Sequence, residues 1–248
     1  MPNQIQKELE LAKTKLLSTI QGTGLVKLST DNVAMVEAMI CNDSAYLKSG
    51  NREAGPIKKR NGEIKYGGST AYWMIQLKSF LEQDNCPQNA YRNIIFETVK
   101  AVDRDNSTRI NTDNCGREEI TNRISNILPK DLMKRLKTAD LELVNIISAR
   151  TSAQARARVN PSFASKFCHY ACFYLFERLP EQDNYSIYDN VVKTVLPKYA
   201  DYYNLILRDL ENYQGYQKMI DEIIAKSKSG ISRNGFDHLL WYYFKGRI

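Results

Sequence analysis

Apolar residues in this chain recur at intervals of three and four along nearly its whole length, the spacing that gives a helix one apolar face. The alternation typical of a strand is confined to two short candidates, residues 61–66 and 185–188. The sequence contains no internal repeat and no low-complexity segment. This pattern predicts an all-α fold.

The helical spacing also predicts where the individual helices lie. They are expected at 3–20, 32–47, 71–83, 88–102, 117–128, 131–136, 139–151, 161–179, 189–210, 216–228 and 236–246. Asp31 is the predicted N-cap of the second helix. The pattern stops in a basic, glycine-rich stretch at 50–70, which predicts a long loop with a short hairpin at Asn61-Gly62. A polar connection then separates a predicted N-terminal region, 1–110, from a second lobe, 111–248.

Composition narrows the class of protein and its partners. With 43% hydrophobic and 25% charged residues, the chain has a globular rather than a disordered composition. The net charge of +7 favours polyanions such as nucleic acids, and also anionic membrane surfaces. No apolar stretch reaches the length of a bilayer span, and the polar first residues lack a signal-peptide core. We therefore expect a cytoplasmic protein that does not cross a membrane.

The cysteines give no metal motif. They are Cys41, Cys86, Cys115, Cys168 and Cys172. Their number is odd and none forms a C-x-x-C pair, so we expect reduced thiols. His169 lies between the last two cysteines, but only those two cysteines share a helix face, and two ligands do not make a zinc site. The sequence therefore predicts core packing at this position, with no metal and no cofactor.

The segment that begins at Pro161 breaks two local rules. Ser162 is its predicted N-cap, and the helix behind it is apolar almost all round, as expected for a central helix. Lys166 is expected in the first turn, against the helix dipole, on one face with aromatic neighbours. Both features favour a neutral amine, which a lysine nucleophile needs. The alternative is that Lys166 extends along its own stem to the surface.

The aromatic neighbours of Lys166 are Phe163, Tyr170 and Phe173, three before, four after and seven after it. Asp189 follows 23 residues after Lys166 and precedes another apolar-periodic helix. Its ordinary role is an N-cap, and a carboxylate fixed at a helix start is also held rigidly for chemistry.

These residues resemble a known family. Pro161-Ser-Phe-Ala-Ser-Lys166 resembles the hairpin of helix-hairpin-helix DNA glycosylases, and Tyr185-Ser-Ile-Tyr-Asp189 resembles their aspartate segment. The ending, Phe236–Gly246, is similar to a terminal helix of bacterial relatives of 8-oxoguanine glycosylases. The resemblance implies a two-lobed helical fold with a central cleft. It also implies excision of a damaged or modified base, followed by strand nicking. Some such relatives are found in anti-phage defence operons, so a defence role is a further expectation.

The resemblance also implies roles for particular residues. Lys166 would be the nucleophile and Asp189 its carboxylate partner. The hairpin positions Ser162, Phe163, Ala164 and Ser165 would contact DNA, and Tyr170, Trp241 and Tyr242 would form the base pocket. Two departures from the family pattern are plain. Serine and alanine replace both hairpin glycines, and Val191 stands where relatives carry a phosphate-contacting histidine. For Trp241 and Tyr242 the alternative is packing in the core.

Two groups of basic residues are candidates for phosphate contacts. The connection arginines are Arg150, Arg156 and Arg158, and the loop cluster is Lys58, Lys59 and Arg60. The alternative for each group is a solvated basic face. The predicted partner is DNA, with RNA still open, and the oligomeric state and the base recognised are open too.

Two other classes of function remain. One is a nucleic-acid-binding module that keeps the fold without catalysis, which the replaced hairpin glycines favour and the presence of Lys166 and Asp189 opposes. The other is a purely structural helical interaction protein, which strong, salt-dependent binding to DNA would exclude.

Overall fold

The computed structural model describes residues 16–42, 57–58, 64–65, 70–83, 87–110, 116–149 and 159–245. The contacts within the chain group it into two compact units. Unit 1 comprises Met1–Tyr46 and Ser186–Ile248, and unit 2 comprises Leu47–Tyr185. The two units therefore do not coincide with the regions 1–110 and 111–248 that the sequence suggested.

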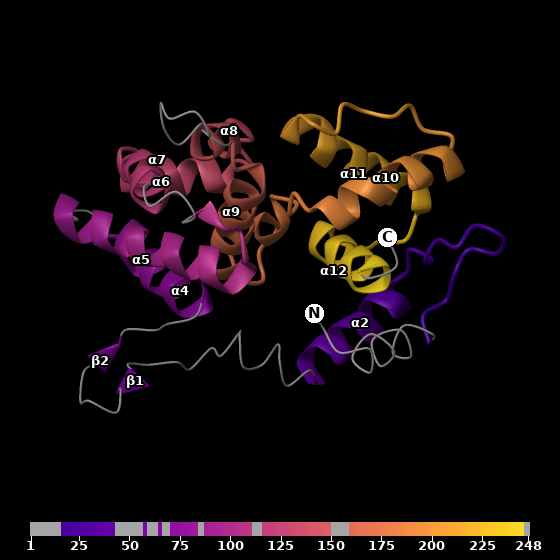
Figure 1. Ribbon diagram of the computed structural model, residues 1–248, viewed down its shortest axis with the longest axis horizontal. Helices are drawn as coiled ribbons and strands as arrows, with labels where there is room; N and C mark the ends of the chain where they lie inside the picture. The colour runs from indigo at the N-terminus through magenta and orange to yellow at the C-terminus, as the bar shows by residue number, and fades with distance from the viewer. Residues whose placement is uncertain are drawn as a thin grey trace. The chain divides into compact units, whose positions relative to one another are not determined.

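Unit 2 is built around one central helix. Its helices are α4 (Thr70–Leu81), α5 (Gln88–Asn106), α6 (Gly116–Ser125), α7 (Pro129–Lys137), α8 (Glu142–Ser148), α9 (Pro161–Leu175) and the 3-10 helix η2 (Pro180–Asp183). Helix α9 packs against α4, α5, α7, α8 and η2, and its central place is visible in Figure 1. Most of its residues are buried. The prediction of a central apolar helix at this position is confirmed.

The connection between α5 and α6 explains why residue 110 is not a boundary between units. Asp103 near the end of α5 accepts hydrogen bonds from the Thr108 hydroxyl at 2.6 Å and the Ile110 N–H at 3.1 Å. It also forms a buried ion pair with Arg117 of α6, with 2.7 Å between Oδ2 and Nη2. One carboxylate thus joins both helices and the start of their connection.

Unit 1 contains helices from both ends of the chain. They are α2 (Thr30–Asn42), α10 (Asn190–Tyr202), α11 (Tyr213–Ser227) and α12 (Arg233–Phe244). Helix α12 packs against α2, α10 and α11, as Figure 1 shows. The buried hydroxyl of Tyr199 in α10 donates to the carbonyl of Val26 at 2.6 Å, which ties the N-terminal segment to the rest of the unit.

One short hairpin interrupts the helical pattern. Strand β1 (Ile57–Lys58) pairs antiparallel with β2 (Ile64–Lys65), with Ile57 opposite Lys65. This pairing agrees with a hairpin in the predicted loop, while Asn61 and Gly62 themselves lie outside the described residues. The other named elements of the described residues are helices, so the all-α fold class is confirmed as well. Within the described ranges, none of the helices combines the length and the apolar content that a bilayer crossing requires.

The first two predicted helices need correction. Residues 16–20 of the helix expected at 3–20 are not helical, and Thr19 instead forms an antiparallel bridge with Val26. Residues 1–15 lie outside the described part. Helix α2 begins at Thr30, and the hydroxyl of Ser29 accepts the hydrogen bond from the Asn32 N–H at 3.3 Å. Asp31 therefore lies in the first turn and is not the cap.

Helix α10 ends earlier than the apolar spacing suggested. Asn204 adopts the left-handed conformation with φ 54°, and the Leu205 N–H returns to the Ala200 carbonyl at 2.8 Å. This is the geometry with which many helices satisfy their last carbonyls. Residues 203–212 consequently form a connection, on which Ile206 is 83% exposed.

Candidate active site

The predicted nucleophile, Lys166, lies on the second of two packed helices. Helices α8 and α9 are in contact, and the Asn160 N–H donates to the Ser148 carbonyl at 2.9 Å, which joins the two ends of their connection. Arg123 of α6 donates to the carbonyl of Ala149 at 2.7 Å, at the end of α8. Unit 2 therefore contains a helix–connection–helix element, and Lys166 lies on its second helix. The connection arginines lie outside the described residues.

The start of α9 differs from the sequence prediction. Asn160 is at the N-cap position without a side-chain cap bond, and Pro161 is the first helical residue. Proline suits this position because its fixed φ fits the helix and its missing N–H needs no partner. Ser162 is therefore not the N-cap but lies in the first turn.

The residues expected to form the hairpin are helical instead. Phe163, Ala164 and Ser165 all lie within α9 and are fully buried in unit 2. The Ala164 N–H is already bonded to the Asn160 carbonyl at 3.0 Å. A phosphate contact by the side chains of these three residues would require them to leave the core of the unit.

Lys166 is the sixth residue of α9, in its second turn, and not in the first turn as predicted. The effect of the helix dipole falls off within the first turn, so the dipole opposes the charged amine less than the sequence suggested. Lys166 is half-buried, and Ser162, Tyr170 and Tyr174 on the same face of the helix are half-buried too. Phe163 is instead fully buried. Lys166 thus belongs to a partly exposed polar and aromatic stripe on an otherwise buried helix.

Tyr170 is fixed one turn after the lysine. Its hydroxyl donates to Oδ1 of Asn106, at the end of α5, at 2.9 Å. The aromatic ring next to Lys166 is therefore held by a helix that packs against α9.

His169 holds Tyr185, the first residue of the stretch 185–188 that leads to Asp189. Its Nδ1 lies 2.9 Å from the carbonyl oxygen of Tyr185, and a carbonyl can only accept, so Nδ1 carries the proton. The hydroxyl of Tyr185 lies 3.1 Å from the carbonyl oxygens of both Arg135 and Asp140, near the end of α7. Tyr185 is thus held in unit 2 by two helices.

The two cysteines of α9 pack in the core as predicted. Cys168 and Cys172 are free thiols with fully buried side chains, and burial raises the pKa of both. Such thiols are poor nucleophiles and poor metal ligands at neutral pH. Among the described residues, no group of three or more potential metal ligands comes together.

The stretch from Tyr185 to Tyr188 is buried but forms neither a strand nor a helix, and Asp189 after it has an extended backbone with φ −121° and ψ 140°. Its backbone groups pair with side chains of α11 instead. The Ser186 N–H donates to Oε1 of Gln217 at 3.1 Å. The hydroxyl of Tyr213 donates to the Ser186 carbonyl, and that of Tyr216 to the Ile187 carbonyl, each at 2.7 Å. The strand predicted at 185–188 is therefore absent, because the buried backbone groups of this stretch pair with side chains and not with a neighbouring strand.

Asp189 ends this stretch as the N-cap of α10, which confirms its expected structural role. Its Oδ1 accepts from the Val191 N–H at 2.7 Å. The carboxylate is half-exposed, and Oδ2 has no hydrogen-bond partner in the described part of the chain. Lys166 belongs to unit 2 and Asp189 to unit 1.

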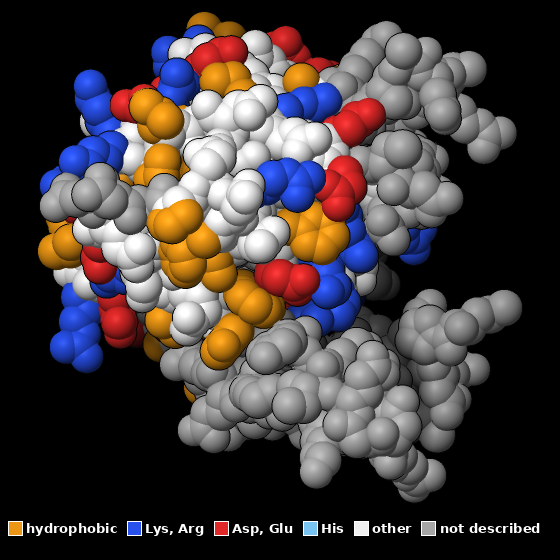
Figure 2. All heavy atoms as spheres, turned by 90° about the vertical axis from the view of Figure 1, so that its left-hand side faces the viewer, with side chains coloured by type: hydrophobic (Ala, Val, Ile, Leu, Met, Phe, Trp, Pro, Cys, Tyr) orange, Lys and Arg blue, Asp and Glu red, His pale blue; other side chains and the backbone are white. Residues whose placement is uncertain are grey.

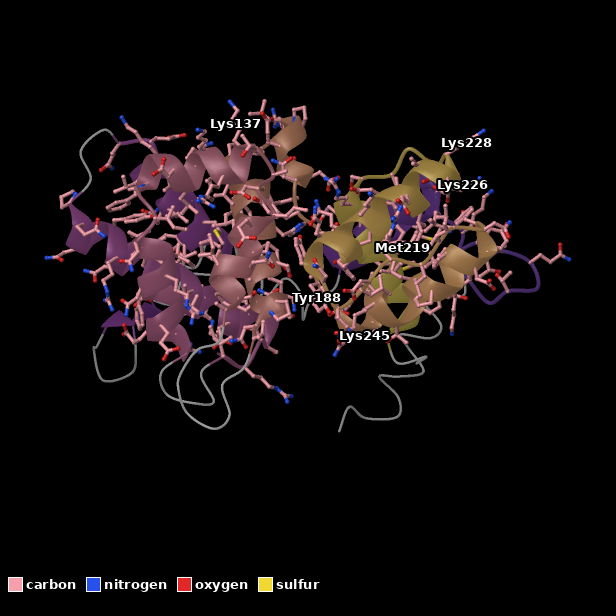
Figure 3. The ribbon with its side chains drawn as sticks, turned by 90° about the horizontal axis from the view of Figure 1, so that it is seen from above. Lys137, Tyr188, Met219, Lys226, Lys228 and Lys245 are labelled. Carbon is pink, nitrogen blue, oxygen red and sulfur yellow. The ribbon has the colours of Figure 1, made fainter. Side chains whose placement is uncertain are left out.

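A second lysine, Lys193, lies one turn into α10. Its Nζ is 3.0 Å from Oε1 of Glu211 and 3.2 Å from the hydroxyl of Tyr188, which is labelled in Figure 3. The hydrogen bond to Glu211 raises the pKa of the Lys193 amine. Lys193 is therefore a charged, ion-paired lysine and not a candidate for the neutral nucleophile.

The predicted base-pocket residues belong to both units. Tyr170 is in unit 2, whereas Trp241 and Tyr242 lie on α12 in unit 1. Trp241 and Tyr242 are half-exposed and so are not core residues. Nζ of Lys245, labelled in Figure 3, lies 3.8 Å from the centre of the Trp241 ring. The cation covers one face of the Trp241 ring, so a base could stack on the other face alone.

A pocket of about 560 Å³ in unit 2 lies elsewhere. It is lined by residues of the α6–α7 connection and by α7, including Asn126, Lys134 and Thr138. None of the predicted site residues lines it.

The loop cluster is described only at one residue, since Lys58 forms part of β1 while Lys59 and Arg60 lie outside the described residues. On the face drawn in Figure 2, lysine and arginine side chains are interspersed with aspartate and glutamate. That face therefore carries mixed charge, and the net charge of +7 is not gathered there into a uniformly basic surface.

Comparison with known proteins gives one match. A family model described as HI_0787_N, N-terminal domain, matches residues 75–174. This stretch is less than half of the chain, lies within unit 2 and includes Lys166, but it stops before the segment that carries Asp189. No curated protein and no solved structure matches the chain significantly.

Three residues that hold the aspartate segment were missed by the sequence interpretation. They are Tyr213, Tyr216 and Gln217 of α11. Their spacing of three and four residues places polar groups together on one face of a helix, which was the available sign. The expected helix began at 216 and so left Tyr213 out.

Proposed function

We propose that this protein is a DNA glycosylase with lyase activity, acting in the cytoplasm on a damaged or modified base resembling 8-oxoguanine. Lys166 is its nucleophile and Asp189 the carboxylate partner. The proposal includes the two-lobed helix-hairpin-helix architecture with a central cleft that the sequence resemblance implies.

One observation supports this proposal above the others. A half-buried lysine on a central helix is followed by a buried extended stretch, which ends in an aspartate fixed at the start of the next helix. Every step of that order matches the resemblance. The free oxygen of Asp189 is also consistent with a second task besides capping, because the cap uses Oδ1 alone.

The chemistry needs a base that is out of the duplex, since the sugar carbon is otherwise out of reach. Neutral Lys166 forms a bond from Nζ to C1′, and the bond from C1′ to the base breaks, with its electron pair leaving on the base. The departing base takes up a proton. The carboxylate of Asp189 stabilises the positive charge that develops on the sugar.

Strand nicking follows from the same lysine. The ring oxygen leaves C1′ and takes a proton, which gives a Schiff base between C1′ and Nζ. Loss of a proton from C2′ then expels the 3′ phosphate by β-elimination. Hydrolysis of the Schiff base returns the free lysine, so neither a metal nor an organic cofactor enters the sequence.

A catalytically inactive nucleic-acid-binding module of the same fold is the second candidate. The helical, buried state of Phe163, Ala164 and Ser165 departs from the open hairpin of the catalytic family, so such a module would have to bind DNA through other residues. Such a module would bind DNA with the usual dependence on salt but would form no covalent adduct.

The test is borohydride trapping on duplexes that carry an abasic site or 8-oxoguanine, supplemented by a panel of other modified bases. Wild type is expected to form a covalent adduct, and Lys166→Gln to form none because glutamine cannot make a Schiff base. Lys226→Gln is the matched control, since this exposed lysine lies at the end of α11 (Figure 3).

Thermal melts establish that Lys166→Gln is folded. Lysine and glutamine have similar helix propensities, and Lys166 is only half-buried, so the cost in stability should stay within about 1 kcal/mol. An adduct formed by Lys166→Gln at the wild-type rate would show that another amine is the nucleophile. Tight, salt-dependent binding without any adduct from wild type would favour the inactive module.

A further inference from the structure

The buried stretch that leads to Asp189 has an unusual means of support. A buried backbone N–H or carbonyl must find a partner, and an extended segment normally finds one on a neighbouring strand. Here the described residues offer no such strand, and the side chains of α11 take its place. The position of this stretch therefore depends on particular side chains and not on a ladder of backbone bonds.

Tyr213 and Gln217 hold Ser186, the second residue of the stretch. The Tyr213 hydroxyl donates to the Ser186 carbonyl at 2.7 Å and lies 2.9 Å from Oε1 of Gln217. The same Oε1 accepts from the Ser186 N–H at 3.1 Å. Both backbone groups of Ser186 are thereby fixed, three residues before Asp189.

Tyr216 holds the other end. Its hydroxyl donates to the Ile187 carbonyl at 2.7 Å, two residues before Asp189. The side chain is fully buried, and its ring lies 4.8 Å from that of Tyr188, measured between centroids. One buried side chain thus holds both the Ile187 carbonyl and the ring of Tyr188, the two residues directly before Asp189.

We propose that Tyr216 is a positioning residue for Asp189, because its hydroxyl sets where the main chain places the carboxylate at the start of α10. This inference depends on the proposed function. Val191 fixes Oδ1 through its N–H, so the carboxylate has little freedom of its own and moves with the main chain. Loss of the hydroxyl removes one fixed point of the segment, so the main chain shifts and carries the Asp189 carboxylate with it, although Asp189 itself is unchanged.

A structural role alone must be separated from this one, and unit 1 offers a matched control. Tyr199 is also fully buried, and its hydroxyl donates to a buried backbone carbonyl, that of Val26, at 2.6 Å. Either Tyr→Phe change leaves a buried carbonyl without its partner, so both variants should lose a similar amount of stability. Of these two tyrosines, Tyr216 contacts the segment that leads to Asp189 and Tyr199 does not.

The experiment measures single-turnover adduct formation and base release with enzyme in excess, at a temperature below the melting point of the least stable variant. Tyr216→Phe is expected to slow both by about tenfold to a hundredfold, the loss that a displacement on the order of 1 Å causes. The rates of Tyr199→Phe should stay within about twofold of the wild-type rates, although its melting temperature falls by about as much as that of Tyr216→Phe. Affinity for the same DNA should not change in either variant.

The decisive measurement is a double-mutant cycle with Asp189→Asn. If Tyr216 acts through Asp189, adding Tyr216→Phe to Asp189→Asn changes the rate by less than about twofold, because the group being positioned is already disabled. If Tyr216→Phe lowers the rate by the same factor in wild type and in Asp189→Asn, the inference is overturned. If Tyr216→Phe does not fold, Tyr213→Phe removes a bond to the same segment and is expected to give the same pattern.

The outcomes separate this inference from the function it depends on. A wild-type protein that traps DNA, with Tyr216→Phe as active as Tyr199→Phe, would overturn the positioning role and leave the proposed function intact. A wild-type protein that forms no adduct on any substrate would overturn both, since Asp189 would then have no reaction to serve.

Discussion

Asp189 has two roles in these proposals, helix cap and catalytic carboxylate, and three variants can separate them. Asp189→Asn keeps the cap, because asparagine caps as well as aspartate, but removes the charge. Asp189→Ala removes both. Asn212→Ala is the control, since Asn212 is the N-cap of α11 in the same unit and accepts from the Gln214 N–H at 2.8 Å.

The expected magnitudes follow from the geometry of the two caps. The bond from Val191 to Asp189 is 2.7 Å long, close to the 2.8 Å of its counterpart at Asn212, so either alanine variant should lose about 1 kcal/mol. For a chain of this size that is a fall of about 2–4 °C in melting temperature. Asp189→Asn should melt within about 1 °C of wild type.

The rates should behave differently from the stabilities. Loss of a carboxylate that acts in proton transfer or charge stabilisation typically costs at least about a hundredfold. We therefore expect Asp189→Asn and Asp189→Ala to slow base release by that factor or more, while Asn212→Ala stays near wild type. The assay is single-turnover base release from an 8-oxoguanine duplex, alongside thermal melts. If Asp189→Ala is no slower than Asn212→Ala, Asp189 is a cap and nothing more.

Two further predictions concern binding and stability. Reversing the charge of the connection arginines or of the loop cluster should weaken binding to all DNA sequences. The slope of the logarithm of the binding constant against the logarithm of the salt concentration should also become less steep, by about 1 for each phosphate that the protein no longer neutralises. Affinity titrations at several salt concentrations check this, and unchanged slopes for both groups would exclude the contacts. Asp103→Ala should cost about 3 kcal/mol in the free energy of unfolding, because it leaves Arg117 and the connection between α5 and α6 without their acceptor. Denaturant unfolding measures this, and a decrease below about 1 kcal/mol would contradict it.

Apolar spacing located the helices well because most of them bury one face against a neighbour, and that face is written into the sequence. Their ends were less predictable. The apolar pattern continues through Leu205, Ile206 and Leu207, yet α10 stops at Tyr202 because Asn204 turns into the left-handed conformation. Asparagine tolerates that conformation, but nothing in the local spacing distinguishes a turn of this kind from one more helical turn.

The start of α9 shows the same limit at the other end of a helix. Ser162 is a good N-cap by type, and Pro161 is a good first residue by type, but the two assignments exclude each other. The structure follows the proline. Lys166 therefore moves from the first turn to the second, and part of the electrostatic argument for a neutral amine is lost while the half-buried, aromatic setting remains.

The support of Asp189 could not have been predicted from its own segment. An extended buried stretch indicated a strand, since strands are the usual way to pair its backbone groups. The partners are instead side chains from α11, about 30 residues later, and only packing in three dimensions brings them together. An interaction that depends on tertiary structure leaves little trace in local periodicity.

The two residues of the proposed reaction lie in different units, and this decides how the tests should be combined. The family match covers the region of Lys166 in unit 2, whereas Asp189 and the side chains that hold it lie in unit 1, beyond that match. Loss of trapping in Lys166→Gln with full activity in Asp189→Asn would therefore keep the lysine chemistry and require a different carboxylate. The opposite pattern would require a different amine. Both residues are assigned to one reaction only if both variants lose activity. The effect of Tyr216→Phe on the rate must also disappear in the Asp189→Asn background.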